Sequence, residues 1–246
     1  MTQGGPSNRD LVVLLTTQRQ LLWHTILGRK QVASPSNQSV GIDMNFLDRV
    51  YHVLNAEASA IRSIPNDTIQ NWLPIAAQEI INCQGKVVTT GMGKNGSVAR
   101  RVASTLSCTG TSAFYMHSGE GSHGDLGMIS KGDILLALSN SGKTREVLEV
   151  VEKIKEVYAD SVTIITITGH ENSPLSKMAD IALCYGLISE PCPLGLTPSS
   201  SLAAMSALLD ALALGVMEMR GFTREEFAHR HWSGYLSSKI AEESHE

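Results

Sequence analysis

The sequence has 246 residues, of which 42% are hydrophobic and 18% charged, with 21 glycines and a formal net charge of −4. This length and composition are typical of one globular domain with a sizeable core, with or without a short appendage. The negative charge argues against a nucleic-acid groove or a polybasic membrane surface. No apolar stretch approaches the roughly 18 residues expected of a membrane span.

The four cysteines show no C-x-x-C spacing and lie inside or beside apolar runs. This pattern favours buried thiols in a reducing compartment, which predicts a cytoplasmic protein. Cys192 has no paired His–Asn arrangement nearby in the sequence, so we interpret it as a buried thiol and not as a nucleophile.

The first 43 residues differ from the rest, because Asp10 is their only acid before Asp43 while arginines recur. We predict a flexible N-terminal extension at residues 1–43, followed by one domain at residues 44–246. An acid-poor, Arg-containing start resembles an organellar transit peptide. The alternatives are a plain tail, or a start codon placed too early with Met44 as the true beginning.

Hydrophobic spacing predicts two helices at residues 45–64 and 68–82, with Pro65 ending the first and Asn66 or Asp67 capping the second. From residue 86 onward, short β-branched runs alternate with helical stretches. Strands in which apolar and polar residues do not alternate predict an α/β fold, with a five-stranded parallel sheet and helices on both of its faces. The expected strands are 87–90, 112–116, 134–138, 162–168 and 181–185, and the expected helices are 97–107, 145–157, 174–178 and 198–219.

Two loops of small residues each follow a predicted strand and precede a helix. The first loop is residues 91–96 (Gly-Met-Gly-Lys-Asn-Gly), and the second loop is residues 139–144 (Ser-Asn-Ser-Gly-Lys-Thr). Such turns aim free backbone N–H groups and the positive helix end at one point, where an anion can bind. Ordinary small-residue turns are the alternative, but two in consecutive βα units favour phosphate. The expected contacts are Gly93 and Asn95 in the first loop and Ser139, Asn140, Ser141 and Thr144 in the second.

The first loop also matches the dinucleotide fingerprint G-x-G-x-x-G, so a Rossmann oxidoreductase is a second interpretation. That fold needs an acid at the end of the next strand to hold the ribose. Here the strand is followed by His117, with Glu120 beyond it, and Lys94 puts a charge inside the glycine turn. We therefore disfavour this interpretation, and a Walker A loop is excluded because no G-x-x-x-x-G-K-[ST] occurs.

The pattern S-x-S-G-x-T after a parallel strand, paired with an upstream G-x-G loop, resembles the sugar isomerase (SIS) domains that bind phosphosugars. Further motifs resemble the arabinose-5-phosphate isomerases more specifically, in the same order across roughly residues 45–238. They are Gly91 to Lys94, the run HSGEGSHGDLGM at 117–128, Ser139 to Gly142, EPCPLGL at 190–196, and RGFT at 220–223 with Phe227 and His231 behind it.

This resemblance implies a fold, an activity and a site. The family interconverts D-ribulose 5-phosphate and D-arabinose 5-phosphate for synthesis of the eight-carbon acid sugar KDO. It implies Lys94, Glu146, Glu190 and His231 as the catalytically relevant set, and sugar-phosphate contacts at Gly110, Thr111, His117 and His123. It also implies a homo-oligomer, a tetramer, while the net negative charge predicts no nucleic-acid or membrane partner. No cofactor is required, and zinc at His117 is expected as an adventitious or inhibitory ion.

The sequence departs from the family pattern in three places. Asn95 stands where the family has Ser, and His231-Trp232-Ser233-Gly234 stands where it has H-P-G-G. We also expect a form without the tandem CBS domains of many members. The first two differences leave open another sugar, such as a hexulose 6-phosphate.

Aldose–ketose isomerisation moves a proton between C1 and C2 through an enediol, which requires a base, a proton shuttle and an electrophile. Glu146 lies one helical turn beyond the second loop and is expected to face the sugar. The apolar and Pro neighbours of Glu190 are expected to raise its pKa. His231 follows the last long helix and is expected to reach a neighbouring subunit's site. A sugar-phosphate sensor without turnover is the alternative of a different class.

Overall fold

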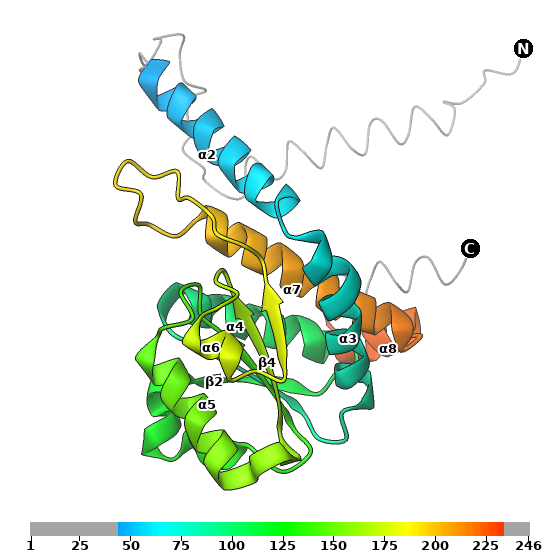
Figure 1. Cartoon of the computed structure of the whole chain (residues 1–246). Coiled ribbons are helices and arrows are strands. Elements are labelled where there is room, and N and C mark those ends of the chain that lie inside the picture. Colours follow the sequence, from blue (N-terminus) through cyan, green and yellow to red (C-terminus); the bar gives the residue numbers. More distant parts are fainter. Residues whose placement is uncertain (1–43, 234–246) are drawn as a thin grey trace, which may run out of the picture. The chain divides into compact units, whose positions relative to one another are not determined.

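The computed structural model describes residues 44–233 of the chain (Figure 1). Contacts between residues divide the chain into two units, residues 1–47 and residues 48–246, and nearly all of the described residues belong to the second unit. The N-terminal extension expected at residues 1–43, together with the transit peptide and the alternatives to it, lies outside the described residues.

Five short strands form one sheet in the order β2-β1-β3-β4-β5, and all of their pairings are parallel. Their middle members are buried throughout, because helices cover both faces and leave no polar side to expose. The predicted α/β fold is therefore confirmed. The strands are β1 (Val87–Gly91), β2 (Ala113–His117), β3 (Ile134–Leu138), β4 (Thr163–Thr168) and β5 (Ile181–Cys184).

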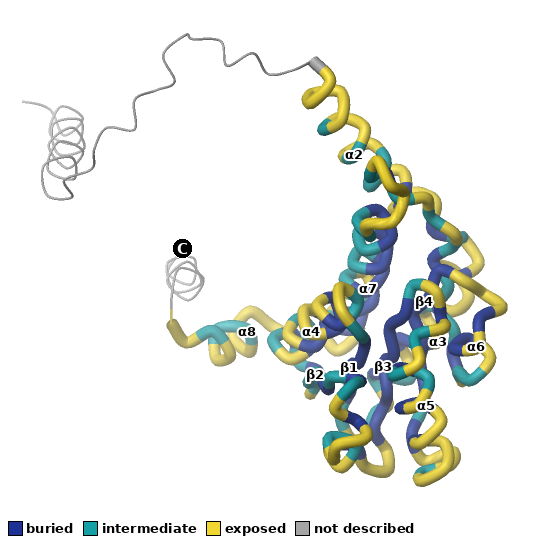
Figure 2. Tube along the Cα trace, turned by 90° about the vertical axis from the view of Figure 1, so that its left-hand side faces the viewer, coloured by how far each residue is buried: buried dark blue, intermediate teal, exposed yellow. Residues whose placement is uncertain are grey.

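Two hydrophobic clusters lie on the two faces of the sheet. One cluster joins α3, α4 and α7 to side chains such as Leu136 and Ile165. The other joins α5 and α6 to the alternate side chains of the same strands, such as Leu135 and Ile164. Burial in Figure 2 follows this division, with dark blue along the central strands and yellow on the outer side of α5. The longer helices are α2 (Met44–Arg62), α3 (Leu73–Asn82), α4 (Gly93–Cys108), α5 (Arg145–Tyr158) and α7 (Ser200–Met219).

The shorter helical elements depart most from the sequence-based expectations. The helix expected at 68–82 forms without a break, but its first part is a π-helical turn, η1 (Thr68–Trp72), before α3, because Pro74 has no N–H to continue the α-helical ladder. Asp67 makes no N-cap bond and instead accepts hydrogen bonds from Asn71 Nδ2 and Trp72 Nε1. The remaining short elements are η2 (Ser118–His123), η3 (Asp125–Met128), η4 (Ala159–Ser161), α6 (Pro174–Lys177) and α8 (Arg224–Arg230).

Helix α8 was not expected from the sequence. Thr223 Oγ1 accepts a hydrogen bond from the Glu226 N–H, and the Glu226 carboxylate accepts one from the Thr223 N–H. This reciprocal capping box satisfies two N–H groups that the first turn of a helix leaves unpaired. The T-x-x-E spacing was a readable signal, so the segment before His231 is a capped helix and not an irregular tail.

Helix α7 is the one described helix long and apolar enough to cross a membrane by length and composition, which differs from the expectation that no apolar stretch approaches that length. Half of its most apolar window is buried inside the protein, and Leu208, Leu209 and Leu212 pack in the first hydrophobic cluster. Its apolar character is therefore explained by its contacts with α3, α4 and the sheet.

The crossovers leave the middle of the sheet in opposite directions. The chain passes from β1 through α4 to β2 on one side, and from β3 through α5 to β4 on the other. Because α4 and α5 also cover opposite faces, the topology switches between β1 and β3. In open α/β sheets, ligands bind in the crevice outside the carboxyl ends of strands at such a point.

Candidate functional site

The first and second loops start side by side at the topological switch point. Gly91, the last residue of β1, pairs with Leu138, the last residue of β3. The next residues, Met92 and Ser139, therefore leave the same edge of the sheet together. The fold thus places the two predicted phosphate loops together at the carboxyl ends of adjacent strands.

The second loop is closed by hydrogen bonds of its own. Ser139 is fully buried, and its hydroxyl lies 2.8 Å from Thr144 Oγ1. Ser141 is exposed, and its Oγ accepts a hydrogen bond from the Lys143 N–H at 3.2 Å. Of the three predicted hydroxyls, Ser141 is therefore the most exposed and Thr144 is half-buried, and α5 begins directly after them with its free N–H groups and positive end.

Gly142 is required where the second loop turns. It adopts φ +61°, and a Cβ there would overlap Ser173 Oγ, in the loop before α6. Both the left-handed backbone and the closeness of Ser173 exclude a larger residue. The loop is thus held against the segment that follows β4.

The first loop becomes helical earlier than expected, because α4 begins at Gly93 and not near residue 97. Gly96 approaches the backbone of β1 so closely that a Cβ would lie 2.8 Å from the Gly91 carbonyl oxygen. Lys94 is exposed on the first turn of α4, and Asn95 is half-buried beside it. Both predicted contacts therefore lie at the N-terminus of a helix that starts at the switch point.

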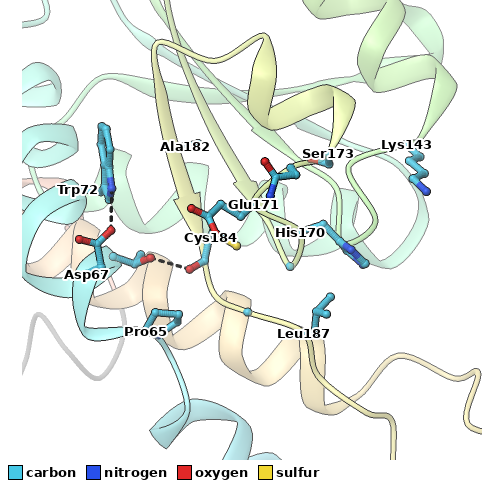
Figure 3. A pocket seen from close by; sticks show the side chains of 14 residues that line it. Pro65, Asp67, Trp72, Lys143, His170, Glu171, Ser173, Ala182, Cys184 and Leu187 are labelled. Carbon is cyan, nitrogen blue, oxygen red and sulfur yellow. Dashed lines mark hydrogen bonds between the residues drawn. The ribbon is translucent and has the colours of Figure 1, made fainter.

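Two hollows flank the second loop. The first has a volume of about 730 Å³ and opens between η1, the segment after β4 and the end of β5. In Figure 3, Lys143 and His170 border it opposite Asp67 and Trp72. Sequence reasoning missed the contribution of residues 169–173 to this hollow, although a Gly-His-Glu-Asn-Ser run at the carboxyl end of a parallel strand was a usable signal.

The second hollow, also about 730 Å³, lies between η2 and the first turns of α5. His123 and Glu146, both predicted site residues, line it together with Met92 of the first loop. Glu146 is half-buried and sits in the first turn of α5, where the helix end favours a negative charge. The structure thus brings Glu146 and His123 to one cavity, which is also lined by Met92 of the first loop and by Arg145, the residue after the second loop.

His117 ends β2, in register with Gly91 of β1. Its Nδ1 accepts a hydrogen bond from the Gly119 N–H at 3.2 Å, so this nitrogen carries no proton in that arrangement. Within residues 44–233, no three His, Cys, Asp or Glu side chains lie close enough together to hold a metal ion. Zinc at His117 stays a prediction.

Glu190 contradicts one electrostatic expectation. Its carboxylate accepts hydrogen bonds from the N–H groups of Ser199, Ser200 and Ser201 at 2.8, 2.9 and 3.2 Å, at the start of α7. Partial burial acts to raise the pKa of Glu190, but the Ser201 side chain and these backbone N–H groups outweigh it and lower the pKa. The expected rise was wrong, because apolar neighbours in the sequence do not reveal a helix N-terminus that meets the carboxylate in the fold.

Cys192 also differs from expectation, since it is a half-buried free thiol and not a buried one. The N–H groups of Thr197 and Leu196 lie 3.2 and 3.3 Å from its Sγ. Led by the Thr197 N–H, these hydrogen bonds lower the pKa of Cys192 to about 7. All four cysteines are free thiols, and none of them is fully buried.

Three predicted site residues lie at the opposite end of the strands from the two loops, the end where the strands begin. Gly110 and Thr111 precede β2, and a Cβ on Gly110 would lie 2.7 Å from the Phe222 ring that follows α7. His231 ends α8, where it stacks on Phe227 with ring centroids 3.9 Å apart. Within one chain, these residues cannot join Glu190, because α7 leads from Glu190 to this end of the strands over 20 residues, about 30 Å.

Comparison with known proteins identifies the fold just described. Residues 80–215, more than half of the chain, match the SIS domain. The chain belongs to the SIS-domain family. The matched region contains both loops, Glu146, Glu190 and most of α7.

Several relatives of this SIS domain are similar over most of the chain. Arabinose 5-phosphate isomerase KdsD of Salmonella typhi is 40% identical over 188 residues, which are 76% of this chain and 56% of that protein. KdsD of Pseudomonas aeruginosa is 39% identical over 198 residues, covering 80% of this chain and 60% of that protein. The chain thus spans little more than half the length of these curated relatives.

One solved structure resembles this chain along nearly the whole length of the solved chain. The Escherichia coli CFT073 protein c3406, in complex with arabinose 5-phosphate, superposes with a TM-score of 0.70 and 33% identity. The match covers 77% of this chain and 98% of that one.

Proposed function

We propose that this protein is an aldose–ketose isomerase that interconverts D-ribulose 5-phosphate and D-arabinose 5-phosphate through an enediol. The observation that carries the proposal is the second loop at the switch point, with its exposed Ser141 and with Glu146 in the first turn of the α5 helix that follows. Helix ends and neutral donors suit a phosphate, and a carboxylate one turn away suits proton transfer. The named activity of the KdsD relatives supports the choice of sugar.

Lys94, Glu146, Glu190 and His231 are the proposed catalytic set. Glu190 is an ionised carboxylate at neutral pH, because its pKa is lowered. It therefore suits the role of a proton acceptor or of an electrostatic partner, and not that of a proton donor in the resting protein. No cofactor is needed for this chemistry, and zinc is proposed only as an adventitious or inhibitory ion.

A homo-oligomer, proposed to be a tetramer, is part of the same proposal. Tyr51 and Leu54 of α2 are 64% and 57% exposed, a degree of exposure that a second copy would relieve. A second copy can also bring His231, Gly110 and Thr111 to the edge that carries the two loops. A cytoplasmic location and a role in KDO biosynthesis complete the proposal.

The test is to incubate the purified full chain with a panel of pentose and hexose phosphates and to measure turnover by the formation of ketose. We expect conversion of arabinose 5-phosphate to ribulose 5-phosphate well above that of other sugars. If the protein instead turned over a hexulose 6-phosphate, that sugar would replace arabinose 5-phosphate as the proposed substrate. Phosphosugar binding without any turnover would establish a sensor.

A further inference from the structure

A buried tyrosine from the end of β5 reaches the middle of the second loop. Tyr185 is fully buried, and its hydroxyl donates a 2.5 Å hydrogen bond to Asn140 Oδ1. In the sheet order, β4 lies between β3, which leads into Asn140, and β5, which leads into Tyr185. The contact therefore reaches across β4 and joins segments 45 residues apart in the chain.

The backbone of Asn140 is anchored from β4 in addition. Its carbonyl oxygen accepts hydrogen bonds from Thr168 Oγ1 at 3.1 Å and from the Gly169 N–H at 3.0 Å. A Cβ on Gly169 would lie 2.9 Å from Asn140 Oδ1, so glycine leaves the space that the carboxamide fills. The main chain of Asn140 is thus fixed from the end of β4, and its Oδ1 is fixed by Tyr185 just beyond β5.

The orientation of the carboxamide follows from the buried hydroxyl. A hydroxyl proton with no access to water needs an acceptor, and Asn140 Oδ1 is the acceptor that the structure supplies. Burial, and to a smaller extent the nearby Cys184 and Glu190, raise the pKa of Tyr185, so its hydroxyl stays protonated and donates. The inward atom of Asn140 is therefore oxygen, and its Nδ2 faces the other way.

Asn140 Nδ2 has no hydrogen-bond partner among the described residues, and Asn140 is only half-buried at the mouth of the loop. Its two N–H groups are neutral donors beside the exposed Ser141 and the start of α5. An oxygen-rich ligand held at this loop is what such donors would bind.

We propose that Tyr185 is a positioning residue, which holds the carboxamide of Asn140 so that its Nδ2 donates to an oxygen of the bound phosphosugar. The inference rests on the proposed function only for the identity of that ligand. Tyr185 itself does not touch the substrate, and it acts through Asn140 alone.

The experiment is a double-mutant cycle of Tyr185→Phe and Asn140→Ala, read by the KM and kcat of the full-length protein for arabinose 5-phosphate. Tyr185→Phe keeps the ring in the core and removes the hydroxyl. We expect KM to rise about fivefold to tenfold, the loss of one well-placed hydrogen bond, with kcat changed less than about twofold. The double variant should have the KM of Asn140→Ala, because the tyrosine acts only through that carboxamide.

A matched control is Tyr158→Phe, which removes a 2.8 Å hydrogen bond from a half-buried tyrosine to the Ile129 carbonyl, away from the loop. Tyr158→Phe should lower the thermal midpoint of unfolding about as much as Tyr185→Phe does, and it should leave KM unchanged. The proposal would be overturned by an unchanged KM in Tyr185→Phe or by an equal rise in KM in Tyr158→Phe. It would also be overturned if the KM increases of the two single variants multiplied in the double variant.

Binding separates this inference from the proposed function. The four proteins of the cycle are also titrated with arabinose 5-phosphate and with inorganic phosphate by calorimetry. Coupling between Tyr185 and Asn140 with either ligand supports the positioning role even if the wild type turns over no pentose phosphate. Absence of coupling with both ligands overturns that role even if the wild type is an active isomerase.

Discussion

At the residue scale, Glu190 shows how one carboxylate can serve structure and chemistry together. It caps the start of α7 through three backbone N–H groups and also stands in the proposed catalytic set. Such a group is fixed in position and ionised before any substrate arrives. A proton acceptor of this kind is pre-oriented, but its lowered pKa makes it a weaker base.

The cap predicts a pH-dependent contribution to stability. Because the folded-state pKa of Glu190 lies below the usual 4.5, its contribution is present above about pH 4.5 and is lost as the pH falls through the folded-state pKa. Glu190→Gln should therefore unfold more easily at pH 7, by about 1 kcal/mol, a typical value for an N-cap. Urea unfolding from pH 7 downward should show the difference shrink below pH 4.5. A difference that stays constant with pH would contradict this role of the charge.

Ser141 offers a second test at the same scale. Ser141→Ala removes the exposed hydroxyl of the second loop and should weaken phosphosugar binding by roughly 1–2 kcal/mol, as for one hydrogen bond to a charged group. Calorimetry with arabinose 5-phosphate measures the loss. Ser63→Ala is the control, since Ser63 is also exposed and its Oγ donates to the Ala60 carbonyl, outside the site. Equal affinities in wild type and Ser141→Ala would show that the loop does not bind phosphate through this hydroxyl.

At the element scale, the second loop is shaped by its neighbours as much as by its own residues. Its buried end is tied by Ser139 to Thr144, and its turn at Gly142 packs on Ser173 beyond β4. The element before α3 shows the same influence, since η1 exists because Pro74 interrupts the helical ladder.

Gly142→Ala should destabilise the protein by about 3 kcal/mol, the combined effect of an L-residue at positive φ and of an overpacked contact with Ser173. Gly195→Ala is the matched control, because Gly195 has φ +64° with nothing within 4 Å of a Cβ. Gly195→Ala should show the backbone strain alone, about 1 kcal/mol. Equal urea midpoints for the two variants would contradict the packing of Gly142 on Ser173.

At the scale of the whole molecule, the proposed catalytic set is divided between the two edges of the sheet. Lys94, Glu146 and Glu190 lie at the edge with the carboxyl ends of the strands, whereas His231 lies beyond the far end of α7. A complete set therefore requires residues of two chains, which is why catalysis and oligomerisation are coupled in the proposal.

Mixing inactive variants tests this division. Glu190→Gln and His231→Asn should each lower kcat by about 10²–10⁴-fold with little change in KM, because phosphate binding stays in the second loop. Mixed oligomers of the two should regain part of the activity, since some sites contain both intact residues. Glu146→Gln mixed with Glu190→Gln should show no rescue, because one chain supplies both. Absence of rescue with His231→Asn would place the histidine outside the site.

The amino-acid sequence was enough to predict the α/β class, the five strands and the two loops, because these depend on the local hydrophobic period and on small residues at strand ends. It also identified Glu146 beside the second loop, since one helical turn sets that distance. The three-dimensional fold was needed to show which residues lie at the same end of the strands. It put Gly110 and Thr111 with His231, turned the N-terminus of α7 onto Glu190, and brought Tyr185 to Asn140. Each of these contacts joins segments distant in the chain, and no local pattern encodes the path of a crossover or the helix end that a carboxylate meets.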